Sequence, residues 1–111
     1  MRRDDTYLLD ILESTKIALS YVAEKSLDEF YADMQCQDAV VRRIEIIGEA
    51  ARRVSEITRS QNPQIPWREM TSMRNLVIHE YDVVDIDQVW ETVQNKFPSL
   101  IEQLIGIIPP E

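Results

Sequence analysis

The chain has 111 residues, 44% hydrophobic and 29% charged, which is enough for one buried core and predicts a single domain over residues 1–111. With only 2 glycines, long helices are favoured over a turn-rich β fold. The formal net charge of −8 argues against a general nucleic-acid binder, so any RNA-directed activity would need a local basic patch.

The chain carries no sign of export or membrane insertion. Its first residues lead into no uninterrupted apolar run, and no stretch approaches the length of a membrane span. The single cysteine, Cys36, rules out an internal disulfide and suits a reducing compartment. We therefore expect a cytoplasmic protein that does not contact membranes.

Three segments show the apolar periodicity of helices that face a bundle core. Apolar positions recur at alternating steps of four and three: Leu8, Leu12, Thr15, Leu19 and Val22; Val40, Ile44, Ile47, Ala51 and Val54; Ile86, Trp90, Val93, Phe97, Leu100 and Leu104. Strand-type alternation of useful length is absent. The pattern predicts an all-α, up-and-down bundle of four main helices plus one short helix.

Capping residues predict where the first helices begin. Ser26 followed by Glu29 is typical of a capping box, which predicts a short helix over residues 27–32. Asp33 can cap a long helix that runs to about Arg59. Gly48 lies inside that helix, where glycine costs roughly 1 kcal/mol relative to alanine. We therefore expect a second helix to approach closely at Gly48.

The second half begins with a proline-containing loop over residues 60–66. Pro66 is expected at the first position of the next helix, which should run through Arg74 towards His79. Asp85, with Gln88 three residues later, resembles a second capping box at the start of the last helix. Gly106 can end that helix.

The only histidine lies in the most informative segment of the chain, where Arg74, Asn75, His79 and Tyr81 occur within eight residues. His79 is the one side chain whose ordinary pKa suits proton transfer near neutral pH, and Arg74 offers donors that fit a phosphate. On one regular helix Tyr81 would point away from His79, about 200° around the axis. The two share a site only if the helix stops just after His79, so we expect His79 in the last turn and Tyr81 in the following loop.

A structural interpretation of the same residues stays open, because a histidine in a last helical turn also interacts favourably with the helix dipole. Metal sites are not expected, since one histidine and one cysteine lie far apart in the sequence. No glycine-rich phosphate loop is present, which excludes nucleotide binding of the P-loop or Rossmann type.

The motif Arg74-x4-His79-x-Tyr81 resembles the signature of the HepT-like members of the HEPN superfamily, which are all-α ribonuclease toxins. The resemblance covers nearly the whole chain. Its further landmarks are Leu9-Asp10-Ile11, Phe30, Asp38-Ala39-Val40, Arg43-Ile44-Glu45, Ile47-Gly48-Glu49-Ala50, Ile65-Pro66-Trp67, Met73-Arg74-Asn75 and Val89-Trp90.

This resemblance implies a homodimer in which two copies of the motif meet in one cleft. It implies a metal-independent endoribonuclease, the toxin of a type VII toxin–antitoxin system, acting on RNA such as tRNA. The implied partner is a minimal nucleotidyltransferase antitoxin that transfers AMP from ATP onto Tyr81 and silences the toxin. No other cofactor is implied.

The chemistry of metal-free RNA cleavage fits these residues. It needs a base for the 2′-hydroxyl, an acid for the leaving 5′-oxygen and positive charge at the phosphorus. We expect His79 as acid and base, Arg74 on the scissile phosphate and Asn75 orienting either one. Because one histidine cannot easily make both proton transfers, a two-fold dimer would supply the second.

The charges around the motif leave an alternative open. Acidic residues surround the motif and would repel RNA. The positive charges that could offset this repulsion are Arg42, Arg43, Arg52 and Arg53, which form either a basic stripe for RNA or simply a solvent-exposed helix face. The alternative is a non-catalytic adaptor that binds a substrate or nucleotide for a nucleotidyltransferase, with Arg74 and His79 holding a phosphate.

Overall fold

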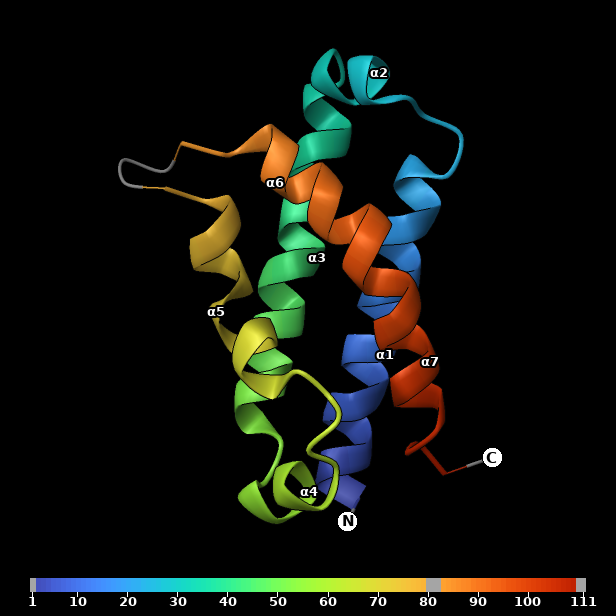
Figure 1. Cartoon of the computed structure of the whole chain (residues 1–111), viewed down its shortest axis with the longest axis vertical. Coiled ribbons are helices and arrows are strands. Elements are labelled where there is room, and N and C mark those ends of the chain that lie inside the picture. The colour runs from blue at the N-terminus through green and yellow to red at the C-terminus, as the bar shows by residue number, and fades with distance from the viewer. Residues whose placement is uncertain (1, 80–82, 110–111) are drawn as a thin grey trace.

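The structure, a computed structural model, describes residues 2–79 and 83–109, whose helices run alternately up and down the long axis of the molecule (Figure 1). The main helices are α1 (Arg2–Val22), α3 (Met34–Arg53), α5 (Trp67–Val77) and a final stretch made of α6 (Ile86–Glu91), the π-helical turn η2 (Thr92–Lys96) and α7 (Phe97–Ile105). Short helices lie in two connections: α2 (Leu27–Tyr31) and α4 (Glu56–Gln61). The all-α, up-and-down prediction is confirmed, and α4 is an addition to it.

The core forms where α3 packs between α1 and α5, with α7 covering another side of α1 (Figure 1). Many of the fully buried side chains come from the apolar stripes found in the sequence, among them Val40, Ile44, Ile47 and Phe97. Burying each such side chain contributes roughly 1.5–3 kcal/mol, so these stripes hold the bundle together. None of the described helices combines the length and the apolar character needed to cross a membrane.

Gly48 lies where two main helices, α3 and α5, approach each other closely. A Cβ placed on it would lie 3.2 Å from the carbonyl oxygen of Met70 in α5. The close approach predicted for this glycine is therefore confirmed, and it fixes the position of α5 against α3.

The predicted caps at the start of α2 and α3 are confirmed. Ser26 and Glu29 form the full reciprocal capping box, and the Asp33 carboxylate accepts a hydrogen bond from the backbone of the third residue of α3. Pro66 takes the N-cap position of α5, with φ −80°, so Trp67 is the first helical residue, one position later than predicted.

The long helix ends at Arg53, and the prediction that it runs to about Arg59 is wrong. Val54 is extended, with ψ 135°, and the Ser55 hydroxyl accepts a hydrogen bond from the backbone N–H of Thr58 to cap α4. Asp4, which is buried at the start of α1, accepts hydrogen bonds from the Ser55 backbone N–H at 3.0 Å and the Thr58 hydroxyl at 2.6 Å. These bonds stabilise the break, and those from the Ser55 and Thr58 side chains lower the pKa of Asp4 most.

The last helix contains the π-helical turn η2, which no periodicity predicted. Pro98 is the second residue of α7, and a proline inside a helix lacks the N–H and collides with the carbonyl four residues earlier. The wider turn accommodates this interruption while Val93, Phe97 and Leu100 stay buried. Gly106 ends α7, as predicted.

Candidate active site

The C-terminal end of α5 is held by a short backbone pairing. Ile78 is extended, with φ −119° and ψ 115°, and forms an isolated antiparallel bridge with Val84. The His79 N–H donates to the Val83 carbonyl at 2.8 Å, and the Asp85 N–H donates to the Val77 carbonyl at 2.7 Å. The chain therefore turns back on itself between α5 and α6.

This pairing corrects the predicted position of His79. The helix ends at Val77, so His79 lies two residues beyond it in extended backbone, not in the last turn. The β-branched Val77 and Ile78 favour extended backbone, and the bonds to the Val83 carbonyl and from the Asp85 N–H replace helical ones. The helix dipole therefore does not explain this histidine.

The imidazole of His79 contacts a carboxylate that caps the next helix. Its Nε2 lies 2.9 Å from Oδ2 of Asp85, while Oδ1 of Asp85 accepts a hydrogen bond from the Gln88 N–H at 3.1 Å. The bond from His79 and then the bond from Gln88 lower the pKa of Asp85. The predicted cap is confirmed, although the Asp85 N–H bonds to Val77 and not to a Gln88 side chain.

An ionised Asp85 determines which nitrogen of His79 donates the hydrogen bond. An ionised carboxylate only accepts hydrogen bonds, so Nε2 of His79 must be the donor. In neutral imidazole the other nitrogen, Nδ1, then carries the free lone pair. The His79 side chain is 55% exposed, which leaves it open to a substrate.

Arg74 lies in the last turn of α5, with its guanidinium at the surface. Its Nε is 3.7 Å from Oε2 of Glu45 on α3, and Oε1 of the same carboxylate is 3.9 Å from Nη1 of Arg42. The Arg74 side chain is 45% exposed, so the ion pair is weak and can exchange for a phosphate. Asn75 is exposed on the same helix.

Tyr81 lies outside the described residues, between His79 and Val83 in the sequence. The predicted place of Tyr81 in the loop after α5 therefore has no structural description here. Arg74 and His79 both lie at the C-terminal end of α5, and Asp85 is brought to His79 by the returning chain.

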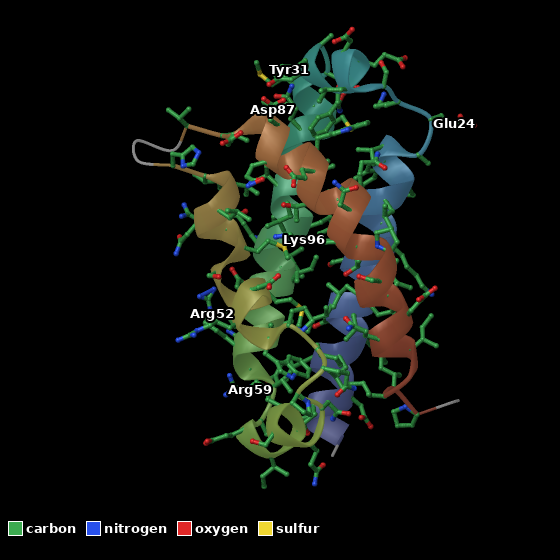
Figure 2. The ribbon with its side chains drawn as sticks, viewed as in Figure 1. Glu24, Tyr31, Arg52, Arg59, Asp87 and Lys96 are labelled. Carbon is green, nitrogen blue, oxygen red and sulfur yellow. The ribbon has the colours of Figure 1, made fainter. Side chains whose placement is uncertain are left out.

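Acidic side chains surround this end of the bundle, as the sequence indicates. Figure 2 shows Asp87 of α6 close to Tyr31 of α2, and the hydrogen bond to Asp87 raises the pKa of Tyr31. Among residues 2–79 and 83–109, no three His, Cys, Asp or Glu side chains gather closely enough to hold a metal ion.

Two partners of the motif were not identified from the sequence. Asp85 was assigned only the role of a helix cap, and Glu45 none. Neither has a sequence signal as a partner, because each meets its partner through the path of the backbone or a contact between helices and not through a helical spacing.

The fold is an all-α bundle with an exposed arginine in the last turn of α5 and an exposed histidine just beyond that helix. The comparisons with known proteins identify the class of the protein. The sequence profile of the family described as "Ribonuclease HepT-like" matches residues 11–107. The chain belongs to this family.

Similar proteins carry related names. A "Probable ribonuclease HepT" of Thermococcus cleftensis is 39% identical over 99 residues, covering 89% of this chain and 90% of that protein. A "Putative RNase" of Caldanaerobacter subterraneus subsp. tengcongensis is 33% identical over 111 residues, covering 100% of this chain and 99% of that protein. A "Gamma-glutamylcyclotransferase and putative RNase" of Methanocaldococcus jannaschii is 40% identical over 109 residues, and this chain spans 49% of its length. No solved structure matches the chain significantly.

Proposed function

We propose that this protein is a metal-independent endoribonuclease in which His79 and Arg74 carry the chemistry. The observation that supports the proposal most is the contact between His79 and the ionised Asp85 in a chain of the ribonuclease HepT-like family. Nδ1 of His79 would remove the proton from a 2′-hydroxyl, and the 2′-oxygen would attack the adjacent phosphorus. Arg74 would stabilise the charge that develops on the phosphate.

The bond from phosphorus to the 5′-oxygen then breaks, and that oxygen takes a proton from an acid. The products are a 2′,3′-cyclic phosphate and a 5′-hydroxyl. We propose that the acid is the protonated His79 of a second copy, in a cleft between two chains of a homodimer. Asn75, exposed beside Arg74, would orient the substrate or His79.

The test is cleavage of a mixed RNA pool, with the product ends identified. We expect cyclic phosphate ends, activity that survives EDTA, and a loss of roughly 10²-fold or more in His79→Ala, as for removal of a general acid–base group. A chelator that abolishes cleavage, or a His79→Ala variant that keeps it, contradicts the proposal.

We further propose that the protein is the toxin of a toxin–antitoxin pair, silenced by a cognate nucleotidyltransferase. The Tyr81 hydroxyl would attack the α-phosphorus of ATP, releasing pyrophosphate and giving up its proton. The attached AMP adds bulk and a negative phosphodiester near the motif, which opposes binding of RNA phosphate to Arg74.

Tyr81→Phe should escape this silencing, because it lacks the hydroxyl that accepts AMP. Intact mass after coexpression with the partner should show one AMP on the wild-type chain and none on Tyr81→Phe. If Tyr81→Phe is still modified and inactivated, another residue is the target.

A non-catalytic adaptor is the second candidate, favoured by the net charge of −8 and by the carboxylate of Glu45 beside Arg74. An adaptor predicts no toxicity on expression and no RNA cleavage by any preparation. Growth arrest that disappears with His79→Ala would distinguish the nuclease.

A further inference from the structure

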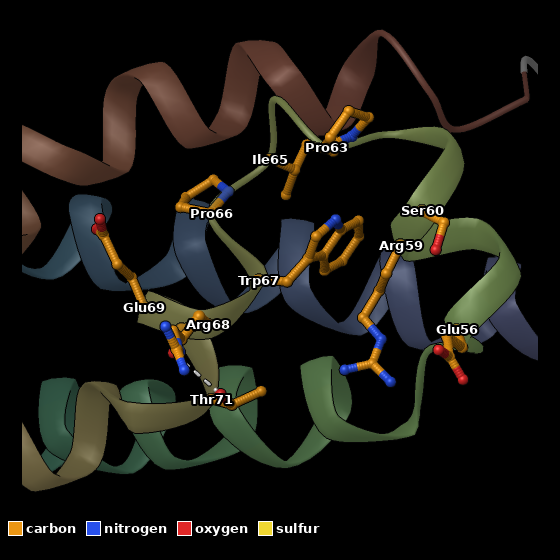
Figure 3. Close-up of a pocket in the computed structure, with 10 residues that line it drawn as sticks. All are labelled: Glu56, Arg59, Ser60, Pro63, Ile65, Pro66, Trp67, Arg68, Glu69 and Thr71. Carbon is orange, nitrogen blue, oxygen red and sulfur yellow. Dashed lines mark hydrogen bonds between the residues drawn. The ribbon is translucent and has the colours of Figure 1, made fainter.

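A hollow lies at the other end of α5 from His79, where α5 meets α4 and the loop between them (Figure 3). Its volume is about 730 Å³, and its lining includes Arg59, Pro63, Trp67, Arg68 and Thr71. Figure 3 shows Arg59 and Arg68 on opposite sides of Trp67. The indole Nε1 of Trp67 donates to the Asn62 carbonyl at 2.9 Å, so the Trp67 side chain is held in place against the loop.

Two arginines line this hollow, and a third lies nearby on α3. Arg59 and Arg68 line it, and the Nε of Arg59 is buried with no hydrogen-bond partner among the described residues. Nη2 of Arg52 lies 3.8 Å from the position that a Cβ on Gly48 would occupy. The carbonyl oxygen of Thr71, a residue that lines the hollow, also lies 3.8 Å from that position. Figure 2 shows Arg52 and Arg59 along one edge of the bundle. Guanidinium groups that line one hollow indicate a place for an anion.

The distribution of charge along the chain supports the same conclusion. Residues 42–74 carry seven arginines against four glutamates, whereas the rest of the chain carries five cations against sixteen carboxylates. Two of those four glutamates lie beside cations, Glu45 near Arg74 and Glu69 4.0 Å from Lys96. The protein therefore gathers its positive charge on the α3–α4–α5 side.

We propose that this arginine hollow binds two neighbouring phosphates of the RNA strand whose scissile bond lies at His79, one at each lining arginine, which rests on the ribonuclease function proposed above. The terminal guanidinium nitrogens of Arg59 and Arg68 would donate to the phosphate oxygens, and Arg52 would add charge at the rim. Glu56 and Glu69 also line the hollow, but both side chains are exposed and can turn away.

The dimensions fit a single strand that follows α5. An eleven-residue helix is about 16 Å long, which corresponds to roughly five nucleotides of stacked strand at 3.4 Å each. Arg74 and Arg42 lie further along the same pair of helices, so a strand running from the hollow to His79 would pass cations at both ends. A substrate of about eight nucleotides or more would reach both sites.

The test measures binding of a 12-nucleotide RNA to the His79→Ala protein, which prevents cleavage during the measurement. In that background Arg59→Gln with Arg68→Gln is compared with Lys16→Gln with Lys25→Gln, which removes the same charge from α1 and the turn after it. We expect the arginine pair to weaken binding about 10-fold or more and to reduce the slope of log affinity against log salt by about 1.4, two phosphate contacts on a single strand. The lysine pair should change the affinity less than about 2-fold.

Arg59 is partly buried, so its substitution could also affect folding. The single variant Arg68→Gln controls for this effect, because Arg68 is exposed. It should lower the salt slope by about 0.7 at an unchanged melting temperature. If both arginine variants keep the RNA affinity and the salt slope of the parent protein, the proposal that the hollow binds RNA is wrong, even if the wild-type protein cleaves RNA. If the wild-type protein cleaves no RNA but the arginine variants still lose binding, the nuclease proposal fails and the hollow stands.

Discussion

Asp85 uses its two carboxylate oxygens for two different tasks. Oδ1 caps α6 by accepting from Gln88, and Oδ2 accepts from His79. One side chain therefore couples the start of a helix to the orientation of the candidate base. A rigid helix N-terminus is a better support for a catalytic histidine than a mobile loop side chain, because it fixes both the direction and the tautomer of the ring.

Asp85→Asn separates these two tasks. Asparagine caps helices as well as aspartate does, so the melting temperature should change little. Its amide lacks the ionised acceptor that selects the donor nitrogen of His79, so we expect kcat to fall roughly 10-fold or more, a part of the 10²–10⁴ that general acid–base catalysis contributes.

The matched control is Asp87→Asn, which removes the same charge two residues further along the chain, in the first turn of α6. Steady-state kinetics on a short RNA should show kcat reduced and KM unchanged for Asp85→Asn, and neither changed for Asp87→Asn. Equal effects of the two variants would mean that only the overall charge matters.

At this scale the sequence identifies Arg74 and His79 but not their partners. Asp85 is recognisable as a cap because capping depends on residues three apart in the chain. Its contact with His79 depends on Ile78 pairing with Val84, a return of the backbone that has no periodicity to detect. The position of a functional side chain just after a helix is therefore harder to predict than the helix itself.

At the scale of elements, Asp4 joins the start of α1 to the break between α3 and α4. Hydrogen bonds from Ser55 and Thr58 lower its pKa, so the folded state favours the ionised form more than the unfolded chain does. The resulting stability is fully present above the unfolded pKa of about 3.9 and is lost as the pH falls through the lower folded pKa.

Asp4→Asn should therefore destabilise the protein near neutral pH and weaken its acid sensitivity. The expected loss at pH 7 is about 2–3 kcal/mol, the usual contribution of hydrogen bonds to a charged group. Thermal unfolding between pH 3 and pH 7 should show the gap from wild type shrinking below pH 4. Asp5→Asn, at the adjacent and less buried position, is the control; a gap of constant size would show that Asp4 does not titrate with folding.

Gly48 tests how tightly α3 and α5 pack. On propensity alone, Gly48→Ala would stabilise α3 by roughly 1 kcal/mol. Its Cβ would lie 3.2 Å from the Met70 carbonyl, a backbone atom that cannot move without α5, so we expect a net loss of about 1 kcal/mol instead. The control is Gly106→Ala, whose nearest atom would lie at 3.4 Å and whose φ of −66° suits alanine. Chemical denaturation that shows both variants stabilised would contradict the tight crossing.

The sequence predicts these elements unequally well. The apolar stripes locate the main helices, and Gly48 indicates the crossing correctly. The stripe that includes Val54 continues through the break after Arg53, because Val54 is buried whether or not the helix continues. Long-range hydrogen bonds to Asp4 decide that break, and a local pattern does not contain them.

At the scale of the whole molecule, the proposed chemistry requires two chains. Cleavage needs a base and an acid at once, and each chain supplies one histidine. A closed two-fold dimer places the same surface of both chains together, so two copies of the α5 end would face one phosphate. The acidic residues near the motif then make the paired Arg74 side chains more important, since they must offset repulsion of the RNA from both chains.

This arrangement makes a quantitative prediction for mixed dimers. If both histidines act on one phosphate, a dimer with one His79→Ala chain is inactive, and an equal mixture of wild-type and variant chains should retain about a quarter of the wild-type activity per total protein. Independent sites would retain about half. Coexpression of differently tagged chains allows the mixed dimer to be purified and its activity measured directly. A mixed dimer with one Lys16→Gln chain is the control, because that substitution should leave the activity unchanged. Light scattering establishes that the protein is a dimer. If the mixed dimer has half the wild-type rate, one chain alone carries out the complete reaction. That chain must then contain a second proton donor besides His79.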